Sequence, residues 1–483
     1  MNDSQLIDAF SSLRILCVGD VMLDQFIRGT ISRISPEAPV PILRIKDEST
    51  VLGGAGNVVR NLEALGSYIT FISVIGQDRN GSHIQSLLKS SSQIDPYLII
   101  DNARITTTKT RFIATNQQIL RTDTEQTFPI QKKSESELFK LFKDHICSHD
   151  LVILSDYAKG LFSPHTLHLL INEAQNHGKP VLVDPKGGDY TRYKGATLLT
   201  PNRQELAFAT LSTIETKEDL VTAAHKVIEK CDLKAMVVTL GPEGMSLIED
   251  SGNIEHLPTQ ALEVFDVSGA GDTVIATLAV CLAAGAPLAK AMHLANTAAG
   301  LVVAKVGTAI VHQDELLAAL HCQEVQAHEK KIVSREKARE QVQKWKRRGN
   351  RIVFTNGCFD LLHPGHIHLL SQAKKAGDRL IVGLNTDYSV QKLKGPQRPI
   401  QHESDRAFVL SSLEGVDLVV LFEEETPFEL IQILKPDVLV KGADYKIDQV
   451  IGGPFVQSYG GQILLIDLLK GQSTTRMVAK MVT

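Results

Sequence analysis

Residues 266–273 read Asp-Val-Ser-Gly-Ala-Gly-Asp-Thr, a glycine-rich turn that enters a long apolar run suited to a helix. Such a turn points the unpaired backbone N–H groups of Gly269, Ala270 and Gly271 at one spot, at the positive end of the helix dipole. The sequence therefore predicts a cradle for an anion. Asp272 stands at its mouth, where a carboxylate is well placed to accept a proton from a hydroxyl that attacks a phosphoryl group. On the turn alone, a helix-capping role for Asp272 is the alternative.

A second glycine-rich turn, residues 53–57, reads Gly-Gly-Ala-Gly-Asn and heads another helix-like run. Glycines such as Gly54 let the backbone approach a ligand closely, and Asn57 offers a donor and an acceptor to a sugar hydroxyl. Asp20 and Asp24 follow the first expected strand, where carboxylates can accept hydrogen bonds from further hydroxyls. For each aspartate, a turn or cap role remains open.

Two further turns contain groups that suit a nucleotide and its metal ion. Asn202 and Glu205 follow an expected strand and could place an amide and a carboxylate near a magnesium ion and its waters. Thr239 and Gly241 lie where another strand ends in a tight turn suited to nucleotide phosphates.

Basic residues gather around a stretch that interrupts the main pattern. Lys109, Arg111 and Arg121 lie in this stretch, and Arg104 and Lys186 lie outside it. For each of them taken alone, a solvated surface charge with no binding role is the alternative. Taken together, they favour a substrate with an anionic group, such as a phosphosugar.

A second candidate site begins at residues 355–366, Thr-Asn-Gly-Cys-Phe-Asp-Leu-Leu-His-Pro-Gly-His. His363 and His366 are three residues apart and share one face of a first helical turn. Such a pair could bind a metal or be satisfied in a core, but no third ligand has suitable spacing, and Pro364 with Gly365 favours a tight helix start. Two imidazoles at a helix N-terminus are better suited to hydrogen-bond a polyphosphate.

The end of the chain supplies further phosphate-binding candidates. Ser473, Thr474 and Thr475 follow the last expected strand and offer hydroxyls and free N–H groups at the start of a helix. Lys394 and Lys441 add positive charge.

Alternating strand and helix patterns must position these residues. Continuously apolar strand runs that end in polar turns indicate a doubly wound α/β domain, with ligands at the carboxyl ends of its strands. The expected strands are residues 14–18, 69–75, 151–155, 181–184, 197–200 and 235–240. Residues 26–45 and 106–122 alternate polar and apolar types, which predicts a small half-exposed sheet that serves as a lid or dimer surface.

The character of the chain changes after residue 311, where charged residues become frequent. We expect a first domain at 1–318, a helical charged linker at 319–345 and a smaller α/β domain at 346–483. The strands expected in the second domain are residues 351–355, 380–384, 418–422, 438–440 and 462–466.

Composition excludes several classes of protein. The 483 residues are 43% hydrophobic, enough for sizeable cores, and the net charge of −4 argues against a protein that chiefly coats nucleic acid. No apolar run approaches the ~20 residues of a membrane span. The six cysteines form no CxxC pair, and no signal peptide is visible, so a cytoplasmic protein is expected.

Residues 1 to about 315 resemble the ribokinase-like carbohydrate kinases through Gly-Gly-Ala-Gly-Asn, Asn-x-x-Glu and Asp-x-x-Gly-Ala-Gly-Asp. The resemblance implies that Asp272 is the general base and that the N–H groups of residues 269–271 form the anion hole. It also implies that Asn202 and Glu205 organise Mg²⁺ through water and that Asn296 lines the adenine pocket of ATP. Asp20, Gly54 and Asn57 would hold the sugar; Asp24, Lys109, Arg111 and Lys186 complete the expected substrate site.

The second domain resembles the cytidylyltransferase-like nucleotidyltransferases, whose motif is Gly-x-Phe-Asp-x-x-His-x-Gly-His. The implied reaction is attack of a phosphate on the α-phosphorus of a nucleoside triphosphate, with release of pyrophosphate. His363 and His366 would stabilise the transition state. The other nucleotide-binding residues that the resemblance implies are Asn356, Gly357, Phe359, Lys394, Lys441, Ser473, Thr474 and Thr475.

A kinase followed by a nucleotidyltransferase resembles the bacterial bifunctional enzymes that activate heptose phosphates with ATP for the lipopolysaccharide core. The alternatives are a different sugar kinase joined to a cofactor-type adenylyl- or cytidylyltransferase, and a nucleotide-sensing scaffold without activity. The presence of Asp272, His363 and His366 argues against the scaffold. The expected partners are phosphosugars, ATP and a second copy of the chain bound through the lid sheet, with no nucleic acid and no membrane.

Overall fold

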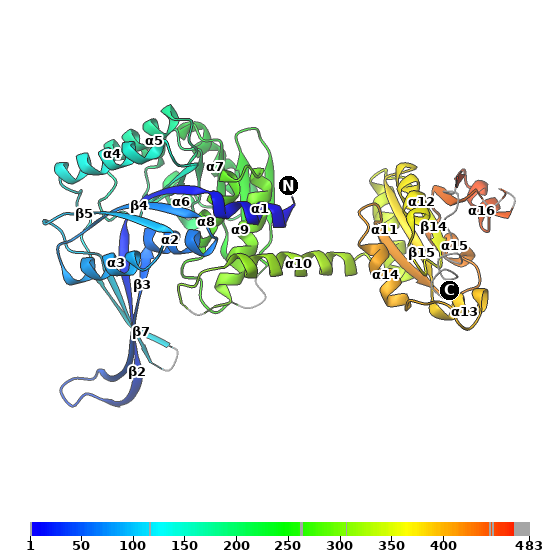
Figure 1. Ribbon diagram of the computed structural model, residues 1–483, viewed down its shortest axis with the longest axis horizontal. Coiled ribbons are helices and arrows are strands. Elements are labelled where there is room, and N and C mark those ends of the chain that lie inside the picture. Colours follow the sequence, from blue (N-terminus) through cyan, green and yellow to red (C-terminus); the bar gives the residue numbers. More distant parts are fainter. Residues whose placement is uncertain are drawn as a thin grey trace. The chain divides into compact units, whose positions relative to one another are not determined.

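The computed structural model describes residues 2–114, 117–260, 264–305, 307–443, 446 and 449–467. Contacts divide the chain into two compact units, Met1–Leu320 and His321–Thr483 (Figure 1). Each unit is described by itself. Among the described residues, no helix has the length and apolar character needed to cross a membrane.

A nine-stranded sheet forms the centre of the first unit, in the order β13-β12-β11-β10-β9-β8-β1-β4-β5. The β11–β12 and β12–β13 pairs are antiparallel and the other pairs are parallel, so the expected doubly wound domain is confirmed. Its strands are β1 (Arg14–Gly19), β4 (Tyr68–Ile75), β5 (Ile94–Ile100), β8 (Leu151–Ser155), β9 (Val181–Asp184), β10 (Leu198–Leu199), β11 (Ala235–Thr239), β12 (Met245–Glu249) and β13 (Ile254–Leu257).

The sheet separates two apolar cores. Successive side chains of β1 point to opposite faces, so Ile15 and Cys17 pack in one core while Leu16 and Val18 pack in the other. Helices cover both faces, which explains why these strands read as continuous apolar runs. The helices are α1 (Asp3–Ala9), α2 (Ala55–Ala64), α3 (Arg79–Lys89), α4 (Lys132–Ile146), α5 (Pro164–Asn176), α6 (Arg203–Thr210), α7 (Lys217–Cys231), α8 (Ala270–Ala283), α9 (Leu288–Val303) and α10 (Gln313–Glu329).

A separate four-stranded sheet forms the lid, in the order β3-β2-β6-β7. It consists of β2 (Val21–Ile34), β3 (Pro41–Gly54), β6 (Thr108–Ala114) and β7 (Gln117–Thr124). Figure 1 shows the long β2–β3 hairpin extending away from the helices of this unit. The lid expected from the alternating pattern is present, and β2 begins directly after the first core strand.

The second unit has a parallel five-stranded sheet in the order β16-β15-β14-β17-β18. Its strands are β14 (Ile352–Gly357), β15 (Arg379–Asn385), β16 (Leu418–Phe422), β17 (Val438–Gly442) and β18 (Gln462–Ile466). Its helices are α11 (Arg335–Arg347), α12 (Pro364–Lys375), α13 (Asp387–Lys394), α14 (Glu403–Ser411), α15 (Phe428–Leu434) and α16 (Gly453–Ser458).

The charged stretch before the second sheet does more than connect the two units, because part of it packs within the second one. In α11, Ala338, Val342 and Trp345 are buried in a core of the second unit. Just upstream, Val333 donates its N–H to the carbonyl of Val419 at 3.0 Å, and Val419 donates to the carbonyl of Lys331 at 2.9 Å. Residues 331–333 therefore extend the sheet at its β16 edge.

Candidate functional site

The first site lies where the strand order of the large sheet reverses. Strand β1 pairs with β8 on one side and β4 on the other, and a parallel sheet binds ligands at such a switch point, beyond the carboxyl ends of its strands. Helix α2 follows β3 of the lid, and α8 starts at the predicted anion cradle. The structure brings Asn57 of α2 and Asp272 of α8, 215 residues apart in sequence, into direct contact.

Asp272 does not act as a helix cap. The cap residue of α8 is Gly269, and no side-chain capping bond is present there. Instead, Tyr157 donates its hydroxyl hydrogen to Oδ1 of Asp272 at 2.6 Å, and Asn57 donates its Nδ2–H to Oδ2 at 2.7 Å. The carboxylate thus faces the site interior with both oxygens held by side chains from other elements.

Burial sets the charge behaviour of Asp272. Desolvation raises the pKa of this carboxyl to about 6, the hydrogen bonds from Tyr157 and Asn57 lower it, and the nearby charge of Asp24 raises it. A pKa close to neutral suits a general base that must accept and then release a proton.

The start of α8 has the features of an anion hole. Gly269 has φ of 85°, a conformation natural to glycine, and a Cβ atom there would lie 2.7 Å from Nδ2 of Asn57. A Cβ atom at Gly271 would meet nothing within 4 Å, so the space over this turn is open. Ala270 donates its N–H to the carbonyl of Val267 at 3.3 Å, whereas the next N–H groups have no intrahelical carbonyl partner.

Asp20, an expected sugar ligand, binds a backbone loop in this structure. Its carboxylate accepts N–H bonds from Tyr157 at 2.9 Å, from Lys159 at 3.2 Å and from Leu161 at 3.3 Å. Burial, followed by the charge of Asp156, raises the pKa of Asp20 to about 6. Asp20 therefore holds the loop after β8 against the site.

The basic residues expected to bind an anionic substrate have acidic partners. Arg111 pairs with Asp24 at 2.6 Å, Lys109 with Asp123 at 3.2 Å, and Lys186 with Glu205 at 2.5 Å. Arg121 also pairs with Asp123, and the guanidinium of Arg104 donates to two backbone carbonyls. To bind these basic residues, a phosphorylated substrate would have to displace their present partners.

Asn202 and Glu205 form a capping box at the start of α6. Asn202 Oδ1 accepts the N–H of Glu205, and Asn202 donates its own N–H to Glu205 Oε2, each at 2.9 Å. Asp184, half-buried at the end of β9, lies nearby: desolvation, followed by the charges of Asp272 and Glu205, raises its pKa well above the usual value. A cation would relieve this repulsion, so the donor set fits a magnesium ion.

The metal would rely largely on water and nucleotide oxygens. Within the described ranges, no group of three or more histidine, cysteine or acidic residues could hold a metal ion. Mg²⁺ usually keeps several waters and takes one or two carboxylates together with substrate phosphates, which agrees with this arrangement.

The other expected nucleotide-binding residues lie near the same edge of the sheet. Thr239 ends β11 and bridges to Asn202, and Gly241 has φ of 60° with open space around its Cβ position. Asn296 of α9 is buried and donates its Nδ2–H to the carbonyl of Pro258 at 2.8 Å. Its amide is thus engaged by the backbone after β13.

The second site lies at the switch point of the second sheet, where β14 pairs with β15 and β17. His363 is the cap residue of α12, and His366 lies in its first turn. Their rings stack with centroids 3.8 Å apart, and the Phe359 ring tilts against His366 at 5.1 Å. Phe359 has φ of 40°, and its ring would contact a Cβ atom at Gly357, which explains the glycine there.

The surroundings of the two imidazoles favour their neutral forms. Burial lowers the pKa of His363, and burial together with the charges of His363 and Lys394 lowers that of His366 to about 4. The Nδ1 atoms of both rings and Oδ1 of Asn356 are buried without a partner among the described residues. Lys441 donates to the carbonyl of Asn356 at 3.3 Å.

A cavity of about 610 Å³ opens beside these rings. Its lining residues are Leu362, His363, Pro364, Ile367, His368 and Ser371. The expected phosphate-binding residues Ser473, Thr474 and Thr475 lie outside the described residues, so the structure gives no position for them.

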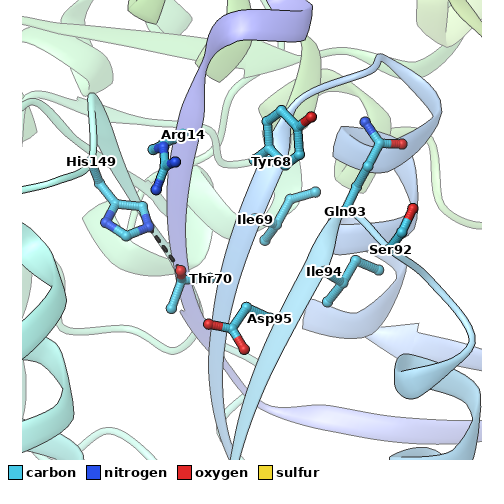
Figure 2. A pocket seen from close by; sticks show the side chains of 9 residues that line it. All are labelled: Arg14, Tyr68, Ile69, Thr70, Ser92, Gln93, Ile94, Asp95 and His149. Carbon is cyan, nitrogen blue, oxygen red and sulfur yellow. Dashed lines mark hydrogen bonds between the residues drawn. The ribbon is translucent and has the colours of Figure 1, made fainter.

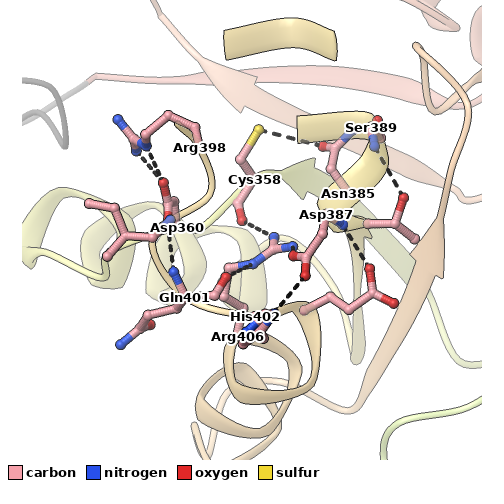
Figure 3. A network of polar contacts seen from close by, with 12 residues as sticks. Cys358, Asp360, Asn385, Asp387, Ser389, Arg398, Gln401, His402 and Arg406 are labelled. Atoms are coloured by element: carbon pink, nitrogen blue, oxygen red, sulfur yellow. Dashed lines mark hydrogen bonds and ion pairs between the residues drawn. The ribbon is translucent and has the colours of Figure 1, made fainter. Parts of the chain in front are cut away.

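A network of buried polar groups holds the loop between β14 and α12 (Figure 3). Arg406 donates to the carbonyl of Cys358 at 2.6 Å, to that of Gln401 at 3.0 Å and to Oδ1 of Asp387 at 2.7 Å. Asp360 pairs with Arg398 and accepts the N–H of Ile400. The motif residues that precede the histidines are therefore anchored to α14 and the loop before it.

Replacement of Arg406 by Met should destabilise the second unit by roughly 2–4 kcal/mol, because two carbonyls and the half-buried Asp387 carboxylate lose their donor. Arg406 is only 1% exposed. The chain contains one tryptophan, Trp345, buried in this unit. Its fluorescence during urea unfolding measures the change in the intact chain.

Arg379→Met is the matched control, since the Arg379–Asp417 pair is partly solvated, and it should cost about 1 kcal/mol or less. Equal losses in the two variants would contradict the anchoring role of Arg406.

A second cavity, of about 350 Å³, lies at the opposite edge of the large sheet, beside the amino ends of β1, β4 and β5 (Figure 2). There, the ring of His149 bonds to Thr70 through Nε2 at 2.8 Å and to the carbonyl of His145 through Nδ1 at 2.8 Å. Both ring nitrogens are satisfied within the fold, and this cavity is remote from the switch point.

Comparison with known proteins assigns a family to each unit. Residues 12–315 match the pfkB family carbohydrate kinases, and residues 354–460 match the cytidylyltransferase-like family. The bifunctional protein HldE of Paramagnetospirillum magneticum is 52% identical over 99% of this chain and 99% of its own. That of Caulobacter vibrioides is 50% identical over 98% of each. The chain belongs to the family of bifunctional HldE proteins.

Solved structures resemble the first unit of this HldE family member in fold. Phosphofructokinase-2 of Escherichia coli, in complex with substrates and products, has a TM-score of 0.56 at 21% identity and covers 64% of this chain and 99% of its own. Arabidopsis thaliana ribokinase, complexed with ribose and ATP, has a TM-score of 0.51 at 20% identity, with coverage of 64% and 98%. The matches to the two family models and to the HldE relatives identify the chain as an ATP-using carbohydrate kinase joined to a nucleotidyltransferase.

The sequence analysis missed Tyr157 and Asp184 in the kinase site of this HldE family member. The signal was present: Ser155-Asp156-Tyr157 follows strand β8, and Asp184 ends β9. The rule that singled out Asp20 after β1, polar residues beyond the carboxyl end of a parallel strand, applies equally to both.

Proposed function

We propose that the first unit phosphorylates heptose 7-phosphate at C1 with ATP and that the second transfers AMP from ATP to heptose 1-phosphate. The products are ADP-heptose, a precursor of the lipopolysaccharide core, and pyrophosphate. The observation that carries the proposal is that the general-base candidate of the first unit and the stacked histidines of the second lie in one chain that matches HldE proteins over 99% of its length. A separate phosphatase must remove the 7-phosphate between the steps.

In the kinase step, Asp272 accepts the proton of the C1 hydroxyl while its oxygen attacks the γ-phosphorus and the bond to the ADP oxygen breaks. The N–H groups at the start of α8 stabilise the charge on the transferring phosphoryl group. Asn202 and Glu205 would hold Mg²⁺ through water. When bound, this ion neutralises phosphate charge.

In the second step, a phosphate oxygen of heptose 1-phosphate attacks the α-phosphorus of ATP, and the bond to the pyrophosphate oxygen breaks. His363 and His366 lie on the first turn of α12, where they can hydrogen-bond the oxygens of the pentacoordinate transition state. Lys394, Lys441 and Ser473 to Thr475 are assigned to the outer phosphates. No covalent intermediate with the protein is needed.

The full-length chain, ATP and Mg²⁺ test the proposal with two readouts. Heptose 7-phosphate should yield ADP, and heptose 1-phosphate should yield pyrophosphate and ADP-heptose. Ribose 5-phosphate, fructose 6-phosphate and CTP serve as competing substrates. If any of these gave a higher kcat/KM than the heptose phosphates or ATP, that compound would be assigned as the substrate. The two reaction classes, sugar phosphorylation and nucleotidyl transfer, would still hold.

We further propose a homodimer formed through the lid sheet. Large apolar side chains are exposed on it, among them Ile34, Ile45 and Leu120, and its outer strands β3 and β7 have open edges in the described chain. Ile45→Asp with Leu120→Asp should convert a dimer to a monomer in light scattering. Leu211→Asp, at the residue that caps the C-terminus of α6 and is 90% exposed, should not. A monomeric wild-type chain would refute the proposal.

We place both reactions in the cytoplasm, where ATP is supplied. Detection of the chain in the soluble fraction of lysed cells would support this placement, and recovery with the envelope after salt washing would contradict it.

A further inference from the structure

Tyr157 lies in the loop after β8 and makes the shorter of the two side-chain hydrogen bonds to Asp272. Its hydroxyl donates to Oδ1 at 2.6 Å, and Asn57 donates to Oδ2 at 2.7 Å. A carboxylate held at both oxygens cannot rotate freely, so the lone pairs that remain have a fixed direction. A general base needs lone pairs with a fixed direction, because the hydroxyl of the acceptor substrate must meet one of them at hydrogen-bond distance.

The position of Tyr157 is set independently of Asp272. Its backbone N–H is bound by Asp20, as are those of Lys159 and Leu161. Asp156 accepts the N–H of Ala158 at 2.8 Å, and Ala158 has φ of 54°, which turns the loop sharply. The ring is therefore placed by its own loop and brings a hydroxyl to the base.

We propose that Tyr157 is a positioning residue of the kinase reaction, whose hydroxyl holds the Asp272 carboxylate ionised and correctly oriented to take the proton of the substrate. This inference rests on the proposed role of Asp272 as general base. Tyr157 acts through Asp272 and takes no part in proton transfer to the substrate.

The groups around Asp272 make this donor important. Asp24 on β2, Asp184 at the end of β9 and Cys17 on β1 interact electrostatically with Asp272, and none of them favours its ionised form. The nearby cations are engaged elsewhere. Arg111 pairs with Asp24, and Lys186 pairs with Glu205.

Helix α2 contributes one further cation, Arg60, which donates to Oδ1 of Asn57 at 3.4 Å and to the carbonyl of Thr308 at 3.3 Å. The negative charge of Asp272 is thus stabilised by two neutral donors, the phenol of Tyr157 and the amide of Asn57. Burial acts against them.

Tyr157→Phe removes one donor and keeps the ring. Because a hydrogen bond to the ionised form lowers a carboxyl pKa, its loss should raise the pKa of Asp272. The acid limb of the kinase kcat/KM profile should then move to higher pH by about one unit, the size of one charged hydrogen bond. Ionisations of the substrates are common to all variants, so only differences between variants are read.

Tyr193→Phe is the matched control. Tyr193 is also a tyrosine that donates to a carboxylate, but it is fully buried and its partner is Oδ2 of Asp156, at 2.8 Å. Its loss should lower the thermal stability and leave the acid limb at the wild-type pH.

Incorporation of 3-fluorotyrosine at position 157 tests the same contact in the other direction. The fluorinated phenol is more acidic and a stronger donor, so the acid limb should move to lower pH. If Tyr157→Phe does not fold, this variant alone decides. If the folded variants keep the acid limb of the kinase kcat/KM profile at the wild-type pH, the inference is overturned. An active Asp272→Asn variant would instead overturn the assignment of Asp272 as the general base.

Discussion

Asp272→Asn should lower the kinase kcat/KM by roughly 10³-fold, within the range of general-base contributions. Asparagine keeps the shape of the side chain but cannot accept the proton of the attacking hydroxyl. The amide must also face two donors, Tyr157 and Asn57, with a single acceptor oxygen. ADP release from ATP and heptose 7-phosphate measures the loss, and pyrophosphate release from the second site of the same chain should stay within about twofold.

Asp219→Asn is the matched control, because Asp219 occupies in α7 the helix position that Asp272 occupies in α8. Asp219 is a capping residue, and its loss should lower the thermal stability slightly with little effect on the kinase rate. If the two variants behaved alike, Asp272 would be only a structural acid. A simultaneous loss of pyrophosphate release after Asp272→Asn would mean that the two activities are coupled.

His366→Ala should produce the reverse pattern, with nucleotidyl transfer lowered by about 10²–10³-fold, the loss typical of one transition-state donor. The ring of His366 stacks on that of His363 and is tilted against that of Phe359, so its removal also frees the other imidazole. Pyrophosphate release with heptose 1-phosphate measures the effect, and the kinase rate should be unchanged. Trp345 fluorescence checks that the second unit remains folded.

His402→Ala provides the comparison for this site. His402 is bonded to Asp387 at 3.2 Å, but its side chain is 86% exposed, so its loss should change the rate less than twofold. Pyrophosphate release at the wild-type rate after His366→Ala would remove that residue from the mechanism.

Much of this architecture follows from local patterns. Buried parallel strands read as apolar runs, and polar residues at their carboxyl ends meet at one edge of the sheet, which is why Asp20 and Asn202 could be placed at that edge. Asn57 and Asp272 were joined in one site by the resemblance to carbohydrate kinases, since neither follows a parallel strand of the large sheet. Strand β5 was missed because Pro96 interrupts its pattern. The hairpin of β12 and β13 was missed although Ser251-Gly252 marks its turn.

The ion-pair partners of the basic residues could not be deduced from residue types. The sequence shows the positive charges of Lys109, Arg111 and Lys186 but not that each lies against a carboxylate, because pairs such as Arg111 and Asp24 are joined only when the lid folds. Tyr157 reaches Asp272 only because its loop is folded around Asp20, a long-range arrangement without a local signature.

Residues 331–333, which pair with β16, affect how the two activities can be separated. A fragment starting at residue 335 would keep α11 and both histidines but would uncover the backbone donors and acceptors of Val419. An open strand edge recruits strands from other molecules, so such a fragment would be prone to self-association even with an intact site. Residues 331–333 therefore cover a strand edge that would otherwise promote self-association. Their sequence is constrained by this pairing as well as by the length needed to connect the two catalytic units.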